Sequence, residues 1–166
     1  MFVFQDWKYN KHDLRIRIVL ALFRLSQFLW QRGALVKIMS APYFILYRVL
    51  VVWIFHIELL PSLKIGRRLR LFHGYALVIH PSSVIGDDVT LRHCTTLGNK
   101  NSGGLGPQIG DRVNIGCNSV IIGNICIGDD VTIGAGSVVI KDIPSGVNIA
   151  GNPARILHTN KNIGIN

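Results

Sequence analysis

Two hydrophobic periodicities divide the chain, a helical one near the N-terminus and a six-residue one over most of the remainder. Apolar residues recur three or four positions apart from Leu14 to Leu29. This spacing predicts an amphipathic helix that ends at Gly33. A second helix is predicted from about Pro42 to His56, because proline is well tolerated in a first helical turn. Pro61 closes this region.

From Ile79 onwards an aliphatic residue recurs at every sixth position, with one interruption. The positions are Ile79, Ile85, Leu91 and Leu97, followed by Ile109, Ile115, Ile121, Ile127, Ile133 and Val139. Small or β-branched residues recur four places after most of them. Ile65 and Leu71 show the same spacing of six earlier in the chain, but they are two residues out of step with the positions from Ile79 onwards. A period of six fits coils of three short strands, each with one inward residue and a tight turn at its corner. The predicted fold is therefore mainly β, a parallel β-helix preceded by a short helical segment.

The interruption of the repeat lies between Leu97 and Ile109. Residues 99–108 are rich in Asn, Gly and Ser, which is typical of a loop, and we expect this loop to be extruded from the β-helix. Loops on a rigid scaffold often carry functional residues. We expect a helical segment over residues 1–60, the β-helix over 61–157 and a C-terminal tail over 158–166.

Positive charge is concentrated in the N-terminal part. The net charge of the chain is +9, and the region before Leu71 accounts for all of it. Such asymmetry suggests a negatively charged partner, and we expect an anionic membrane surface or an anionic polysaccharide rather than nucleic acid. The cations expected to bind lipid headgroups are Arg15, Arg17, Arg24 and Arg32. The alternative is that they lie on solvated helix faces.

Three cysteines, Cys94, Cys117 and Cys126, each lie inside a repeat. Their odd number and the absence of a CxxC motif favour reduced thiols with packing roles in a cytoplasmic protein, and no metal site is expected.

No signal peptide is expected, because charged residues precede the first apolar run. The stretch Ala41–Leu60 is apolar but is interrupted by Arg48, His56 and Glu58. It predicts a buried or interfacial helix rather than a membrane crossing, with the protein placed in the cytoplasm or at the inner membrane surface.

Three stretches carry a resemblance to a known family. They read IGRRLRLFHGYALVIHPSSVIGDDVTLRHCTTLGN, IGNICIGDDVTIGAGSVV and GNPARIL. They resemble the hexapeptide-repeat acyltransferases, in particular the serine acetyltransferases and the O-acetyltransferases of capsule and exopolysaccharide biosynthesis, including the colanic-acid type. The resemblance implies a left-handed parallel β-helix, a homotrimer and acetyl-CoA as co-substrate.

The resemblance also implies a catalytic pair. The family's catalytic histidine matches His73 in Leu71-Phe72-His73, and the carboxylate that orients it matches Glu58, fifteen residues earlier. A neutral imidazole can remove the proton of an acceptor hydroxyl, and a carboxylate can fix its tautomer. His93 is the alternative base or a second contact for the acceptor. The competing interpretations are a structural turn residue for His73 and a solvated helix-end charge for Glu58.

The cofactor site is inferred from the same resemblance. The pantetheine arm is expected along Gly-Ala corners, which match Gly116, Cys117, Gly134 and Ala135, with Lys141 and Arg155 near the CoA phosphates. Gly98 and Asn99, at the start of the loop, complete the predicted set, and the N–H group of Gly98 is a candidate oxyanion donor.

One departure from the serine acetyltransferases concerns the acceptor. Their extruded loop ends in an Arg and a His that hold the amino acid, whereas here Gly104–Gln108 contains neither residue. We therefore expect an O-acetyltransferase that acts on a sugar hydroxyl of a glycan or lipid-linked acceptor. The alternatives are a serine acetyltransferase, a small-sugar or antibiotic acetyltransferase, and a non-catalytic trimeric β-helix scaffold.

Overall fold

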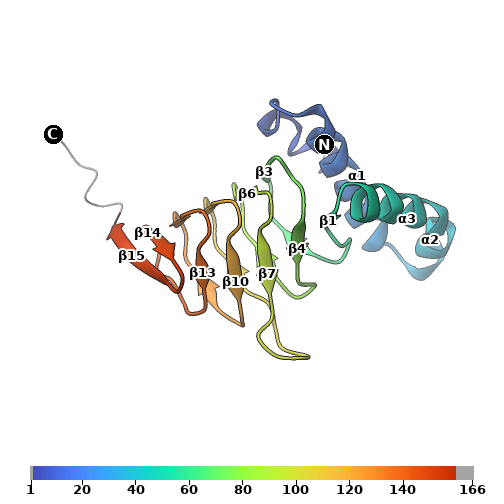
Figure 1. Ribbon diagram of the computed structural model, residues 1–166. Coiled ribbons are helices and arrows are strands. Elements are labelled where there is room, and N and C mark those ends of the chain that lie inside the picture. The colour runs from blue at the N-terminus through green and yellow to red at the C-terminus, as the bar shows by residue number, and fades with distance from the viewer. Residues whose placement is uncertain (1, 160–166) are drawn as a thin grey trace.

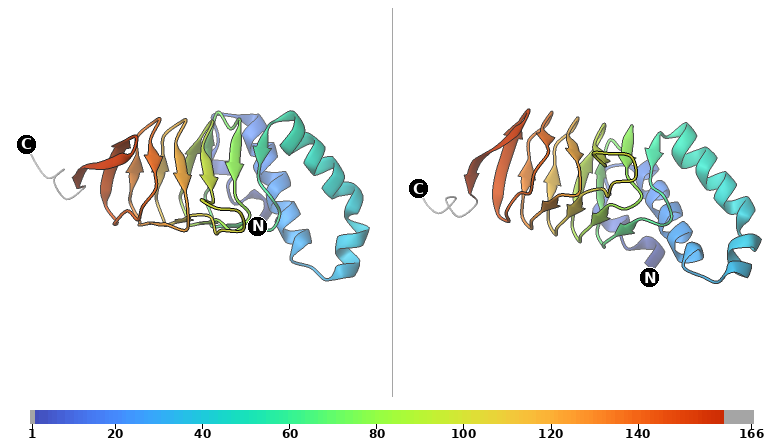
Figure 2. Two further views of the ribbon diagram at one scale, coloured as in Figure 1. Left: turned by 60° about the horizontal axis from the view of Figure 1, so that its bottom comes forward. Right: turned by 90° about the horizontal axis from the view of Figure 1, so that it is seen from below.

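The computed structural model describes residues 2–159 and shows a three-sided parallel β-helix with a helical region at one end (Figure 1). The helical region lies at the end opposite the last strands, and it extends away from the coils as a hairpin of helices (Figure 2). The parallel β-helix predicted from the six-residue repeat and the N-terminal helical segment predicted from the helical spacing are both confirmed.

The helices come first along the chain. They are the 3-10 turns η1 (Phe2–Phe4) and η2 (Trp7–Tyr9), the α-helices α1 (Leu14–Trp30), α2 (Ala34–Met39) and α3 (Ala41–Tyr47), and the π-helix η3 (Arg48–Ile54). Gly33 separates α1 from α2, as the sequence predicts, but the short helix α2 was not expected. No described helix is long and apolar enough to cross a membrane.

Three parallel sheets form the sides of the β-helix. One contains β1 (Ile57–Glu58), β4 (Leu77–Ile79), β7 (Thr96–Gly98), β10 (Val120–Ile122) and β13 (Val138–Val139). The second contains β2 (Lys64–Ile65), β5 (Val84–Ile85), β8 (Gln108–Ile109) and β11 (Cys126–Ile127). The third contains β3 (Arg70–Phe72), β6 (Thr90–Arg92), β9 (Asn114–Ile115), β12 (Thr132–Ile133) and β14 (Val147–Gly151), and β15 (Ala154–Thr159) adds to it antiparallel.

The six-residue repeat places the core. Each of the ten aliphatic residues of the repeat, from Ile79 to Val139, is at most 3% exposed, and most of the small residues four places later are fully buried. Stacking these side chains from coil to coil removes them from water, which is the main stabilising contribution in such a fold.

The two-residue offset of the first phase has a local cause. Phe72 pairs with Arg92 and Val78 pairs with Thr96, so the first coil uses two more residues than the second to turn this corner. The extra residues enlarge the corner that begins at His73.

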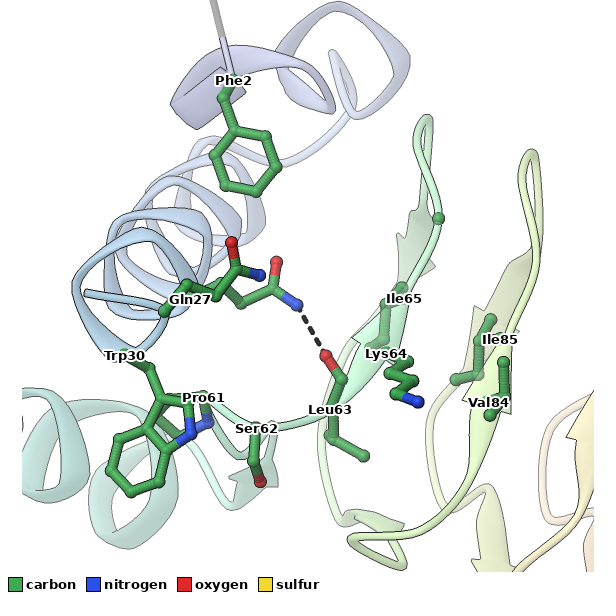
Figure 3. Close-up of a pocket in the computed structure, with 12 residues that line it drawn as sticks. Phe2, Gln27, Trp30, Pro61, Ser62, Leu63, Lys64, Ile65, Val84 and Ile85 are labelled. Atoms are coloured by element: carbon green, nitrogen blue, oxygen red, sulfur yellow. Dashed lines mark hydrogen bonds between the residues drawn. The ribbon is translucent and has the colours of Figure 1, made fainter. Parts of the chain in front are cut away.

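The N-terminal segment covers the open end of the first coil with hydrogen-bonding side chains. Asn10 donates to the Leu69 carbonyl at 2.8 Å and accepts from the Leu71 N–H at 2.9 Å. Gln27 donates to the Leu63 carbonyl at 2.8 Å, beside a hollow of about 460 Å³ between α1 and the second sheet (Figure 3). Buried backbone groups at a sheet end need such partners.

Arg24 is the centre of this capping layer. Its guanidinium forms an ion pair with Asp6 at 2.7 Å and donates to the carbonyls of Ile65 and Gly66. Asp6 also accepts from the Leu69 N–H. Arg24 is 0% exposed, so the expectation that it is one of the cations available to lipid headgroups is wrong. The hydrophobic periodicity places Arg24 on a face of the helix, but it does not show that the Asp6 carboxylate packs against that face.

The expected loop leaves the β-helix between β7 and β8. It spans residues 99–107, because Gln108, the last residue of the expected loop, already belongs to β8. Its base is held by the Gly106 N–H, which donates to Ser82 Oγ at 2.8 Å. The expected tail falls largely on residues 160–166, outside the described residues.

Candidate active site

One corner of the β-helix gathers both candidate catalytic histidines and half of the candidate cofactor residues. This corner joins the third sheet to the first. Phe72 pairs with Arg92, Thr90 with Asn114, and Ile115 with Ile133. The residues that come directly after these strands therefore stack above one another along one edge of the β-helix. The order along the edge is His73, His93, Gly116 with Cys117, and Gly134 with Ala135. Residues 62 positions apart in the sequence thus form one column.

The two histidines are neighbours in this column. The rings of His73 and His93 lie 6.2 Å apart between centroids, at an interplanar angle of 71°. His73 is exposed and has a φ of 53°, a left-handed conformation that the enlarged corner imposes and that non-glycine residues seldom adopt. The imidazole of His73 is therefore presented outward at a corner with a fixed backbone.

His93 carries an unpartnered polar atom. Its ring is half-buried, and its Nδ1 is buried without a hydrogen-bond partner among residues 2–159. A buried polar atom without a partner is costly and is often matched by a bound group. Its position beside His73 suits a contact with an acceptor or with the acyl group.

Glu58 lies on β1, the first strand of the first sheet, in register with Val78. Its side chain is exposed and forms no hydrogen bond or ion pair within the described part of the chain. It comes two residues after His56, the corner residue that begins the first coil and whose ring lies 5.3 Å from that of Tyr75. The pairing of Glu58 with His73 stays a prediction.

Sequence reasoning missed a stacked group beside His73. His12 stacks on Phe72 with ring centroids 4.3 Å apart, and its Nε2 donates to the Leu71 carbonyl at 2.9 Å. The guanidinium of Arg92 lies 5.5 Å from the Phe72 ring, and it donates to Asn114 and to the Ile115 carbonyl. The Phe72 ring thus interacts with both His12 and the guanidinium of Arg92. No local pattern signals His12, because it precedes Phe72 by about sixty residues.

The glycines of the column are required for close stacking of the coils. A Cβ added to Gly116 would lie 2.4 Å from the backbone N of Ala135, which no side chain tolerates. The Gly136 N–H donates to the Cys117 carbonyl at 2.8 Å and ties the two coils together. Cys94 and Cys117 are half-buried and Cys126 is exposed, all as free thiols.

The other candidate cofactor residues lie away from this column. Gly98 ends β7, and Asn99 begins the extruded loop, at the far side of the first sheet. Lys141 and Arg155 line one hollow of about 270 Å³, so the structure brings these two cations together. Because one sheet separates Gly98 from His93, the candidate residues of a single chain form two groups.

A ladder of aspartates stabilises the corner between the second and third sheets. Asp87 accepts from the Arg67 N–H at 2.7 Å, and Asp111 accepts from the Asp87 N–H at 2.8 Å. At the same corner Arg68 donates to Asp88, and this hydrogen bond and charge lower the pKa of the Asp88 carboxyl. These pairs are structural, and among the described residues no group of His, Cys, Asp and Glu is arranged to hold a metal ion.

Comparison with known proteins identifies the family that the chain resembles. Residues 106–141 match the family model described as "Bacterial transferase hexapeptide (six repeats)". The chain is 36% identical over 156 residues to a protein of Escherichia coli strain K12 named "Putative colanic acid biosynthesis acetyltransferase WcaB", covering 92% of this chain and 96% of that protein.

Solved structures of serine acetyltransferases share the fold. The enzyme of Brucella abortus strain S19 in complex with coenzyme A superposes with a TM-score of 0.77 and is 32% identical, covering 88% of this chain and 57% of that chain. The soybean enzyme complexed with serine gives a TM-score of 0.76 at 31% identity, over 87% of this chain and 58% of that chain. The chain thus spans less than two thirds of these enzymes.

Proposed function

We propose that this chain, which belongs to the hexapeptide-repeat family of acetyl-CoA-dependent acetyltransferases, transfers the acetyl group to a sugar hydroxyl in capsule or exopolysaccharide biosynthesis. The observation that carries the sugar assignment is the match to the colanic acid acetyltransferase, which extends over 96% of that protein. The serine acetyltransferases match over little more than half of their length.

The extruded loop supports the same assignment. Residues 99–107 contain Lys100 as their only charged side chain, and the loop has neither the arginine nor the histidine expected to hold an amino-acid acceptor. A bound carboxylate would need such a partner. Under the loop lies a hollow of about 360 Å³, lined by Lys100, Gly104 and Leu105 and by residues of the next corner.

His73 is proposed to act as the general base. Its imidazole is exposed at the corner, and in the neutral form it would take the proton of the acceptor hydroxyl as that oxygen attacks the acyl carbon. Glu58 would orient the ring and stabilise the imidazolium, and the half-buried ring of His93, beside His73, would contact the acceptor. Acetyl-CoA supplies an acetyl group already activated as a thioester, so no covalent enzyme intermediate is needed. As the new ester forms, the acyl C–S bond would break, and CoA would leave as the thiol after taking the proton from the His73 imidazolium.

The residues present fit acetyl-CoA. The Gly116–Cys117 and Gly134–Ala135 corners continue the column from His93. The cations Lys141 and Arg155 share a hollow that Asp142 also lines, and they would meet the CoA phosphates there. Since the two groups of candidate residues lie on different edges of one chain, we propose a homotrimer in which the site is completed between neighbouring subunits. Sedimentation equilibrium is expected to give a trimer, and a fully active monomer would refute this assembly.

Acceptor competition tests the function. Purified protein is incubated with acetyl-CoA and, in separate reactions, with L-serine or with oligosaccharides from an acidic exopolysaccharide. The masses of the products are measured by mass spectrometry. We expect a gain of one acetyl group on the oligosaccharide and little O-acetylserine, with transfer by His73→Ala reduced roughly 10²–10⁴-fold. Efficient O-acetylserine formation would instead assign serine as the acceptor, the second candidate, which the fold match to the soybean enzyme favours.

Absence of transfer to every hydroxyl acceptor, by a folded protein that still binds acetyl-CoA, would refute the sugar assignment. If the protein neither binds acetyl-CoA nor transfers acetyl, the scaffold alternative would hold.

A further inference from the structure

The helical hairpin at the open end of the β-helix presents an apolar surface that nothing in the described chain covers. We call the segment Phe28–Ile54, which comprises the end of α1 together with α2, α3 and η3, the arm. Its tip α2 lies farthest from the coils (Figures 1 and 2). On α2, Leu35 and Ile38 are each 71% exposed and Met39 is 75% exposed. These residues are three and four positions apart, so they share one face of the helix.

The apolar surface continues along the second half of the hairpin. Ile45, Leu46, Trp53 and Ile54 are all more than half exposed. Trp53 and Ile54 come eight positions after Ile45 and Leu46, which is about two helical turns, so the two pairs lie on one side of the segment. Soluble monomers seldom expose so many large apolar side chains in one segment, and such patches mark contact surfaces.

Cations are the only charges on this surface. No Asp or Glu occurs between Asp13 and Glu58. Arg32, Lys37 and Arg48 are at least partly exposed and form no ion pair within residues 2–159. Two of these cations lie over aromatic rings, Lys37 at 4.4 Å from the Trp30 centroid and Arg32 at 4.2 Å from that of Phe28.

We propose that the arm docks the enzyme onto an anionic lipid bilayer. Exposed aliphatic side chains at the tip would enter the boundary between headgroups and acyl chains, while Arg32, Lys37 and Arg48 would meet lipid phosphates. The tryptophans Trp30 and Trp53, 42% and 63% exposed, suit the interface, where tryptophan is enriched. This mode needs no membrane-crossing helix.

The charge pattern argues against a second copy of the arm as the occupant. A self-complementary contact would set Arg and Lys against Arg and Lys with no carboxylate on either side, which costs free energy as the surface is desolvated. An anionic bilayer matches both properties, since it offers hydrocarbon and negative charge in adjoining layers. The inference concerns binding alone and holds for either acceptor.

Vesicle co-sedimentation of the full chain tests the proposal. One set of vesicles contains phosphatidylcholine alone, and the other contains equimolar phosphatidylcholine and phosphatidylglycerol. We expect binding to the second set at low salt, little binding to the first, and loss at 1 M salt, where the Debye length is about 3 Å. A wild-type protein that stays in the supernatant with anionic vesicles at low salt would overturn the proposal.

Variants separate the contributions of charge and apolar contact. The triple variant R32Q/K37Q/R48Q should bind anionic vesicles about 100-fold more weakly, because each basic residue near such a surface contributes roughly fivefold. The double variant I38S/M39S should also bind more weakly. Lys11→Gln and Leu157→Gln, an exposed cation and an exposed apolar residue outside the arm, serve as matched controls and should bind like wild type.

Two outcomes contradict the proposal even if wild type binds. One is a triple variant that binds like Lys11→Gln. The other is an I38S/M39S variant that keeps its lipid binding but sediments as a smaller assembly than wild type, which would make the arm an interface between protein copies. Circular dichroism melts of each variant confirm that the exposed substitutions leave the fold intact.

Discussion

Replacing Arg24 by methionine should destabilise the protein more than any exposed charge substitution. The side chain of Arg24 is 1% exposed, and that of its ion-pair partner Asp6 is 2% exposed. The substitution leaves a buried carboxylate without its cation and removes the donor to the carbonyls of Ile65 and Gly66. Breaking a buried pair by removing one partner costs about 3–5 kcal/mol. For a chain of this size that lowers the melting temperature by roughly 6–20 °C.

The measurement is urea or thermal unfolding followed by circular dichroism, with all variants at one protein concentration because assembly shifts apparent stability. Arg112→Met is the matched control, since Arg112 pairs with Asp130 at 2.7 Å but both side chains are about half exposed, and such pairs contribute little. The double variant D6N/R24M should lose less than the sum of the two single variants, because no lone charge stays buried. If Arg24→Met is no less stable than Arg112→Met, the capping layer is not stabilised as described.

Three further predictions concern the site and the surface charges. His73→Ala should reduce the turnover number in an acetyl-transfer assay roughly 10²–10⁴-fold without unfolding the protein, and a normal rate together with an inactive His93→Ala would move the base to His93. Glu58→Gln should lower turnover by a smaller factor, because the base remains while its orienting charge is lost, and an unchanged rate across pH would remove Glu58 from the mechanism. Since Arg68 lowers the pKa of Asp88 in the folded state, the pair stabilises the protein above the ordinary aspartate pKa near 4, and this stabilisation is lost as the pH falls through the lowered pKa. Arg68→Gln should therefore melt below wild type at pH 7, with the difference shrinking as the pH falls below the ordinary aspartate pKa near 4, and a difference independent of pH would contradict the assignment.

The candidate site could be predicted only in part from the sequence. The motif Leu71-Phe72-His73 identified the candidate base. The six-residue period did not align His73 with His93, because the first coil is offset by two residues, and only the pairing of Phe72 with Arg92 places the two histidines together. The role of Phe72 could not be found in this way. Its stacking on His12 depends on the position of the N-terminal turn. Hydrogen bonds of Asn10 and His12 with Leu71 of β3, about sixty residues later in the sequence, set that position.

The sequence by itself determined the repeating part of the molecule. A strict period of six assigns each inward aliphatic residue to one side of a coil, because adjacent coils repeat the same geometry and only local spacing is needed.

The tertiary structure alone decided how the N-terminal charges are used. Arg24 and Arg32 occur in the same basic segment, yet Arg24 is buried against Asp6 and the edge of the first coil, whereas Arg32 is exposed near the tip of the hairpin. Hydrophobic spacing reports which face of a helix is apolar, but whether a charge can be buried depends on a partner of opposite charge and on free carbonyls being within reach. Those partners come from parts of the chain that are distant in sequence, so only the folded arrangement determines which cations remain for a ligand.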